Sequence, residues 1–243
     1  MPEPPDSSLP SRALKGVIFD LDGTLYDHRR LRVAVAMALV RNLGFRPARL
    51  LRVARILQCY RSALVELRSR AERCEHLRDV QVALTASRCG ESVDAVRECV
   101  RRWFTELPLP LLKRAAQPGL ADALQWMRRA NLKLAVLSDY PAAAKLEAMG
   151  IQQHFDLVLC ADEVGFLKPH PAGLHAVLEQ LELRKDEVLY VGDRFEIDGL
   201  AARRAGVSCA IVGRRGSGSG DWVICASFPE LLRLVAARAR LPE

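Results

Sequence analysis

The stretch VIFDLDGTLYD, residues 17 to 27, decides the fold. With the glycine before it, its first part is the apolar run GVIFD at 16 to 20, which predicts a buried strand that ends at Asp20. A second carboxylate, Asp22, and then Gly23 follow directly. Glycine permits a sharp turn here. The stretch therefore predicts a strand that brings two carboxylates to its carboxyl end.

Further apolar runs of the same kind recur along the chain, separated by helical patterns. This alternation predicts an α/β fold, a doubly wound, Rossmann-like parallel sheet. The predicted strands are KLAVLS at 133–138, FDLVLC at 155–160, DEVLYVG at 186–192, SCAIVG at 208–213 and, as an edge strand, WVICAS at 222–227. The predicted crossover helices lie within 118–131, 141–150, 171–181 and 197–206.

One segment interrupts the alternation, directly after the first strand. It holds four successive helical patterns and is too long for a loop, so an all-helical insertion is expected. Pro108 and Pro110 are predicted to close it. The four patterns span 29–43, 47–70, 76–88 and 92–106. The predicted domains are a disordered leader at 1–13, the Rossmann-like core at 14–26 and 113–243, and the helical insertion at 27–112.

Composition excludes several classes of protein. No apolar run approaches the ~20 residues of a membrane span, and the N-terminus lacks the pattern of a secretory signal. Seven scattered cysteines without a CxxC pair predict reduced thiols and a cytoplasmic location. The net charge of +7 lies in the insertion, where seventeen Arg face nine acids, and no aromatic residues alternate with these arginines. We therefore expect solvated helix faces and no nucleic-acid partner.

Polar side chains gather where the predicted strands end, which is where ligands bind in a doubly wound sheet. Two carboxylates from different strand ends suit Mg²⁺, so Asp20 and Asp193 are candidate ligands. Backbone amides after the sharp turn, those of Gly23 and Thr24, could hold phosphate oxygens. A hydroxyl and a lysine would complete a phosphoryl-transfer site. The candidates are Asp20, Asp22, Gly23, Thr24, Ser138, Lys168, Asp193 and Asp198.

Four motifs at these strand ends, DLDGTL, LSD, LKPHP and VGDRFEID, resemble in order the motifs of the haloacid dehalogenase superfamily. The resemblance covers roughly residues 16 to 227 and implies a Mg²⁺-dependent phosphatase. It implies that Asp20 is the nucleophile that forms an aspartyl-phosphate and that Asp22 is the general acid and base, whose backbone carbonyl also binds the metal.

The resemblance assigns the remaining roles residue by residue. Ser138 would bind the transferring phosphoryl group, and Lys168 would stabilise that group and the nucleophile. Asp193 would bind Mg²⁺, while Asp198 would contact the metal's water shell or orient Lys168. Asp139 stays outside the predicted site, with capping of the following helix as its alternative role.

The insertion resembles the cap of one large subgroup, which closes over the site and excludes water. Substrate choice would then lie in the cap. Asp27, His28, Arg29 and Arg30 follow the first motif most closely, so they are the candidates for facing the cleft. Arg194 follows Asp193 directly and could contact either the substrate or the cap.

The superfamily also contains enzymes that are not phosphatases. Dehalogenases have no use for the acid at position 22, and phosphonatases use a cap lysine, which the insertion lacks. A sugar phosphomutase remains the alternative among enzymes, and a non-catalytic binding or regulatory protein the alternative from another class. The resemblance implies a small soluble phosphorylated metabolite, such as phosphoglycolate or a sugar phosphate, and we expect a monomer or homodimer without membrane partners.

Overall fold

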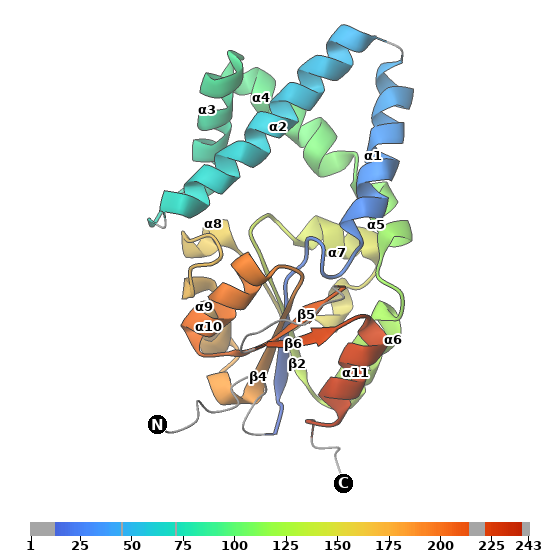
Figure 1. Ribbon diagram of the computed structural model, residues 1–243, viewed down its shortest axis with the longest axis vertical. Helices are drawn as coiled ribbons and strands as arrows, with labels where there is room; N and C mark the ends of the chain where they lie inside the picture. The colour runs from blue at the N-terminus through green and yellow to red at the C-terminus, as the bar shows by residue number, and fades with distance from the viewer. Residues whose placement is uncertain (1–12, 45, 71, 214–221, 240–243) are drawn as a thin grey trace.

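The computed structural model describes residues 13–44, 46–70, 72–213 and 222–239. The predicted leader therefore lies almost wholly outside the described residues. Within them the chain forms a six-stranded sheet of order β3-β2-β1-β4-β5-β6 with every pair parallel (Figure 1). This order confirms the doubly wound fold and the edge position of the last strand. The strands are β1 Gly16–Phe19, β2 Lys133–Ser138, β3 Leu157–Cys160, β4 Val188–Gly192, β5 Ser208–Val212 and β6 Trp222–Cys225.

The strands follow the predicted runs but most are shorter. β2 matches its run at both ends, whereas β4 begins only at Val188 because a 3₁₀ turn, Lys185–Glu187, precedes it. β1 ends at Phe19, so Asp20 lies just past the strand. The Asp20 amide still donates to the carbonyl of Val191, 2.8 Å away, which fixes the start of the following loop beside β4.

Helices cover both faces of the sheet because strand side chains alternate between them. Val17 and Phe19 belong to one buried apolar cluster, on one face of the sheet. Ile18 belongs to a second buried apolar cluster, on the other face. The helices of the core are α6 Leu120–Arg129, α7 Ala143–Met149, α8 Ala161–Val164, α9 Ala172–Gln180, α10 Leu200–Ala205 and α11 Phe228–Ala236. Of these, α8 and α11 had no counterpart among the predicted elements.

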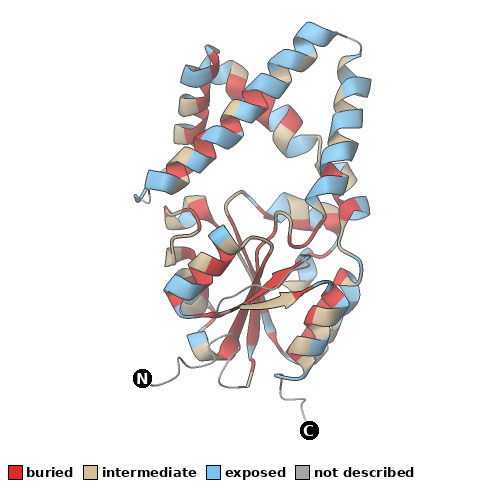
Figure 2. Cartoon of the chain, in the orientation of Figure 1, coloured by how far each residue is buried: buried red, intermediate tan, exposed pale blue. Residues whose placement is uncertain are grey.

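The four helical patterns of the insertion are helices. They are α1 His28–Leu43, α2 Pro47–Arg70, α3 Leu77–Cys89 and α4 Val93–Cys99, the last continued by a π-helical segment, η1 Val100–Glu106. The helices lie over the carboxyl ends of the strands (Figure 1). Most of them pack around one apolar cluster that includes Ile56, Tyr60 and Trp103. α1 differs, because Leu31 is its one buried residue and much of its surface is exposed (Figure 2).

Pro108 and Pro110, predicted to close the insertion, follow the end of η1 at Glu106. They begin a further helix, α5 Leu109–Ala115, with Pro108 at its N-cap. The N–H groups in the first turn of a helix have no acceptor within the helix, so a proline there, which lacks its N–H, loses no hydrogen bond. A proline can therefore begin a helix as well as end one. The predicted domain boundary after residue 112 falls inside α5, and the division into core and cap stays a prediction.

All seven cysteines are free thiols. In the part of the chain that the structure describes, no helix combines the length and the apolar character needed to cross a bilayer.

Candidate active site

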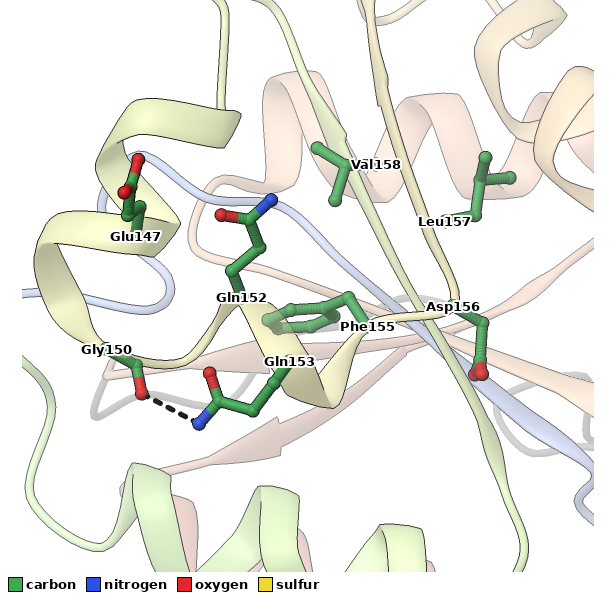
Figure 3. Close-up of a pocket in the computed structure, with 8 residues that line it drawn as sticks. All are labelled: Glu147, Gly150, Gln152, Gln153, Phe155, Asp156, Leu157 and Val158. Atoms are coloured by element: carbon green, nitrogen blue, oxygen red, sulfur yellow. Dashed lines mark hydrogen bonds between the residues drawn. The ribbon is translucent and has the colours of Figure 1, made fainter.

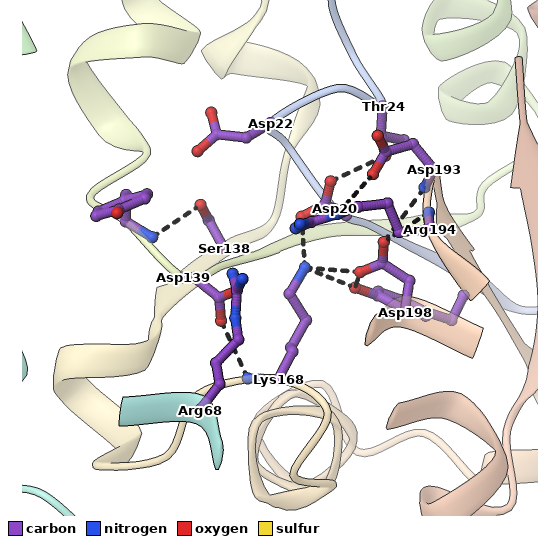
Figure 4. A network of polar contacts seen from close by, with 12 residues as sticks. Asp20, Asp22, Thr24, Arg68, Ser138, Asp139, Lys168, Asp193, Arg194 and Asp198 are labelled. Atoms are coloured by element: carbon purple, nitrogen blue, oxygen red, sulfur yellow. Dashed lines mark hydrogen bonds and ion pairs between the residues drawn. The ribbon is translucent and has the colours of Figure 1, made fainter. Parts of the chain in front are cut away.

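The sheet order places the candidate residues around one point. β1 lies between β2 and β4, so the chain changes direction across the sheet at the β1–β4 pair, where doubly wound sheets bind their ligands. Asp20 follows β1 and Asp193 follows β4, while Ser138 ends β2. Figure 4 shows these side chains converging with Lys168 and Asp198.

Asp20 is almost fully buried at the centre of this group. The hydroxyl of Thr24 donates to its Oδ2 at 2.9 Å, and the ammonium group of Lys168 pairs with its Oδ1. Burial raises the pKa of Asp20 to about 8, although the charge of Lys168 opposes this rise. Both oxygens are thus held in place, and a further cation besides Lys168 would be needed to keep the carboxylate ionised at neutral pH.

Lys168 is also buried, and Asp198 holds its ammonium group from the other side at 2.8 Å. Asp198 accepts further hydrogen bonds from the Tyr190 hydroxyl at 2.9 Å and from two backbone amides. The π-helical turn η4, Phe195–Gly199, brings Asp198 back over Gly192, where an added Cβ would collide with it. Of the two roles left open for Asp198, the geometry supports the orientation of Lys168.

Asp193 has the features of a metal ligand. Its Oδ1 is buried without a hydrogen-bond partner, and its pKa is raised to about 6 by burial and then by the charge of Asp198. One oxygen each from Asp20, Asp193 and Asp198 lie within 4.8 Å of one another, close to the separation of about 4 Å expected for oxygens on opposite sides of Mg²⁺. These carboxylates fit a divalent cation.

Gly23 has a reason to be glycine. Its φ is +105°, and a Cβ there would lie 2.9 Å from Cγ of Asp193 and closer still to Oδ2. The loop after β1 therefore passes directly against the candidate metal ligand. Its neighbour Thr24 is fully buried, and its hydroxyl serves Asp20, which leaves only its backbone amide for the predicted phosphate contact.

Asp22 lies at the edge of the group and has two partners that the sequence did not indicate. Lys145 of α7 pairs with its Oδ1 at 2.6 Å, and the Tyr26 hydroxyl donates to the same oxygen at 2.5 Å. Burial raises the pKa of Asp22, but the charge and hydrogen bond of Lys145 outweigh it, so this pKa is lowered from its ordinary value. Lys145 falls within a predicted helix, and no sequence pattern linked it to Asp22.

Asp139 does not cap the following helix, the alternative that the sequence left for it. Its carboxylate accepts from the backbone amide of Lys168 at 3.0 Å and pairs with Arg68 of α2 at 2.6 Å (Figure 4). Ser138 beside it is buried, and its hydroxyl accepts from the Tyr140 amide at 3.2 Å. The Arg68–Asp139 pair ties the helical insertion to the strand end that carries Ser138.

A cavity of about 630 Å³ lies over Asp20 and Asp22 and extends between the sheet and the insertion. Of the four residues expected to face a cleft, His28 lines it, whereas Asp27, Arg29 and Arg30 do not. Asp27 instead caps α1, accepting from the amide of Arg29 at 2.7 Å. Arg194, whose partner was left open, lines the cavity as well.

A second hollow of about 550 Å³ lies beside the edge strand β3 (Figure 3). None of its eight lining residues is a cation, and its Asp156 already pairs with Arg128 at 2.6 Å. Of these two cavities, the one over Asp20 suits an anionic phosphate.

Known proteins resemble this chain in sequence and in fold. A family model described as haloacid dehalogenase-like hydrolase matches residues 14–206. The phosphoglycolate phosphatase of Photorhabdus laumondii is 31% identical over 208 residues, 82% of this chain and 81% of the relative. That of Pseudomonas putida is 31% identical over 196 residues, 79% of this chain and 67% of the relative. A pyrophosphatase of Halalkalibacterium halodurans is 30% identical over 132 residues, 50% of this chain and 60% of its own length.

Two solved structures illustrate the likeness in fold. The L-2-haloacid dehalogenase from Xanthobacter autotrophicus superposes with a TM-score of 0.68 at 24% identity, over 93% of this chain and all of its own. A phosphatase of the same superfamily from Thermococcus onnurineus superposes with a TM-score of 0.57 at 20% identity and the same coverage.

Proposed function

The chain belongs to the haloacid dehalogenase-like hydrolase family, and from this premise we propose that it is a Mg²⁺-dependent phosphomonoester hydrolase that works through an aspartyl-phosphate on Asp20. The observation that carries the proposal is the setting of Asp20. Its buried carboxylate is held by Thr24 and Lys168 at the floor of the cavity.

The proposed reaction has two steps. In the first, a carboxylate oxygen of Asp20 attacks phosphorus, the bond from phosphorus to the ester oxygen breaks, and Asp22 gives that oxygen a proton. In the second, water attacks the phosphorus of the aspartyl-phosphate while Asp22 takes a proton from the water, the bond from phosphorus to the Asp20 oxygen breaks, and the free Asp20 carboxylate and inorganic phosphate are formed.

Two protonation states of Asp22 are needed. The lowered pKa favours the ionised form, which serves as the base of the second step. The acid form of the first step requires a higher pKa, and the negative charge of a bound phosphate acts in this direction. Lys145, which holds Asp22 at 2.6 Å, therefore affects the balance between the two steps.

We assign Mg²⁺ to the carboxylates of Asp20 and Asp193 and to the backbone carbonyl of Asp22, a set supported by the buried Oδ1 of Asp193, which has no hydrogen-bond partner and lies 3.6 Å from Nε of Arg194. When bound, the ion supplies positive charge that offsets the repulsion between the phosphate and the attacking carboxylate. Lys168 adds a second positive charge at Oδ1 of Asp20, and Asp198 fixes the direction of its ammonium group.

The phosphoryl group is assigned to the hydroxyl of Ser138, to Lys168 and to the backbone amides of Gly23 and Thr24. We assign the helices within 27–112 the role of a cap that covers the site. The Arg68–Asp139 pair and the Arg78–Asp162 pair, each of which joins this segment to the core, support that role.

The relatives are named for phosphoglycolate and pyrophosphate, which supports a small phosphorylated metabolite as substrate. A cytoplasmic location and a monomeric or homodimeric state remain predictions.

Phosphate release from 4-nitrophenyl phosphate, with Mg²⁺ and with EDTA, tests the proposal. We expect release only with the metal and none from Asp20→Asn. Metal-independent release, or activity that survives the substitution, would contradict the mechanism. Transfer of phosphate between positions of a sugar phosphate, followed by ³¹P NMR, would favour the phosphomutase instead.

A further inference from the structure

The cavity over Asp20 is large for the substrate after which the relatives are named. At about 630 Å³ it falls within the range of ~300–1,000 Å³ found for sites that hold drug-sized molecules. In phosphoglycolate, one carbon atom separates the ester oxygen from the carboxylate group. A leaving group of that size would leave most of the cavity to water.

The upper walls of this cavity are mainly apolar, which makes water a poor occupant. Two aromatic rings, Phe104 of η1 and Tyr140 of the core, meet there with centroids 5.1 Å apart. Burial, the largest effect, raises the pKa of Tyr140 to about 12, so its ring stays neutral. The aliphatic lining includes Leu31, Val35 and Leu39 of α1 and Leu57 and Leu64 of α2. Such walls suit a carbon skeleton that contains a ring.

Two arginines interrupt the apolar walls. Arg32 of α1 and Arg61 of α2 both line the cavity and are open to solvent. Within the described residues neither forms an ion pair with a carboxylate, whereas Arg68, also in the lining, is neutralised by Asp139. Partial burial lowers the pKa of Arg61, and the nearby charge of Arg32 lowers it further. An anion between the two guanidinium groups would relieve this repulsion.

The position of Arg61 relative to the catalytic end of the cavity follows from α2. Arg61 and Arg68 are seven residues apart, which is two turns, so they lie on the same face with about 10 Å between them along the axis. Arg68 marks the catalytic end, because its partner Asp139 adjoins Ser138. Arg61 therefore lies about 10 Å above that end.

We infer that the substrate's leaving group is an elongated carbon skeleton with an aromatic ring, carrying a second anionic group, carboxylate or phosphate, that binds Arg32 and Arg61, the latter about 10 Å along α2 from Arg68. The inference rests on the proposed phosphatase function. Such a substrate is larger than the two-carbon phosphoglycolate after which the relatives are named.

The test compares matched substrates of the full-length protein with Mg²⁺. 3-(4-Phosphonooxyphenyl)propanoate carries the ring and a remote carboxylate, its methyl ester lacks only the charge, and 4-(2-phosphonooxyethyl)phenyl phosphate carries a remote phosphate. Phosphoglycolate is the small reference. We expect kcat/KM to be about tenfold higher for the better of the two doubly anionic aryl substrates than for the methyl ester. Phosphoglycolate should rank below all three aryl substrates.

Variants locate the effect. Arg61→Gln and Arg32→Gln should each reduce the advantage of the doubly anionic substrate over the methyl ester several-fold. Arg55→Gln, which removes an exposed arginine of α2 outside the cavity lining, should leave the advantage unchanged. A preference for phosphoglycolate, or an advantage that survives loss of both cavity arginines, overturns the inference while the phosphatase function stands.

A binding measurement separates the two failures. Calorimetry with 3-[4-(phosphonomethyl)phenyl]propanoate, a non-hydrolysable analogue, and with its carboxylate methyl ester reports the same preference without turnover. A Kd about tenfold lower for the free acid, lost in Arg61→Gln, supports the inference even when no ester is hydrolysed, a result that would refute the proposed function alone. Equal Kd values for acid and ester overturn the inference.

Discussion

Replacing Gly23 by alanine tests the link between the loop after β1 and the metal site. At φ +105° an alanine is strained by about 1–3 kcal/mol. Its Cβ would also lie 2.9 Å from Cγ of Asp193, whereas carbon atoms pack at about 3.5–4.0 Å, so one of them has to move by about 0.6–1 Å. Metal sites tolerate ligand displacements of only about 0.2 Å. We expect the Mg²⁺ concentration for half-maximal activity to rise by about 10–100-fold.

Gly90→Ala is the matched control. Gly90 also has a positive φ, +64°, but an added Cβ there meets nothing within 4 Å. It should destabilise the fold by about 1–2 kcal/mol in urea unfolding and leave the Mg²⁺ dependence unchanged. The link between the loop and the metal site is refuted if both variants need the same Mg²⁺ concentration as the wild type, or if both need the same higher concentration.

Three further predictions concern the charged groups. Lys168→Met leaves the buried carboxylate of Asp198 without its cation, so unfolding in urea at pH 7.5 should show a loss of about 3–5 kcal/mol. The loss should be smaller at about pH 5, because the unpaired Asp198 carboxyl takes up a proton more readily there; equal losses would contradict this. Lys145→Met should raise the pKa of Asp22, because the charge and hydrogen bond of Lys145 are what lower it. A ¹³C NMR titration of the Asp22 carboxyl, with Lys145→Arg as control, measures this shift, and an unchanged pKa would contradict the prediction. The pKa of Asp20 is raised from 3.8 to about 8, so the metal-free protein should lose stability as the pH rises between these values. Because Mg²⁺ binds the ionised carboxylate, the increase in Tm that Mg²⁺ causes should grow from about pH 5 to about pH 8.5. An increase that stays constant with pH would argue against Mg²⁺ at Asp20.

The sheet and its polar edge were predictable because both follow from local patterns. A buried parallel strand is a short apolar run, and five such runs with helices between them admit few arrangements. Once β1 and β4 are neighbours, Asp20 and Asp193 must meet, although 173 positions separate their numbers along the chain. Lys168 follows α8, the short helix after β3, and so reaches the same edge, whereas its deep burial was not predicted.

Contacts that depend on how helices pack were not predictable. Lys145 looks like a solvated helix residue, and only the placement of α7 against the loop after β1 brings it to Asp22. Arg68 is one of seventeen arginines in the insertion, and nothing local distinguishes it as the partner of Asp139. α11 was missed for another reason. Ser227 and Glu230 have capping-box spacing at its start, a signal that was present in the sequence but not used.

The central claim is that Asp20 accepts the phosphoryl group. Rapid acid quench during turnover with Mg²⁺, followed by peptide mass spectrometry, tests it most directly. We predict one phosphoryl group on the carboxylate of Asp20, formed before steady state, and none on any residue of Asp20→Asn. A phosphoryl group on another side chain, or unimpaired turnover by Asp20→Asn, would contradict the account.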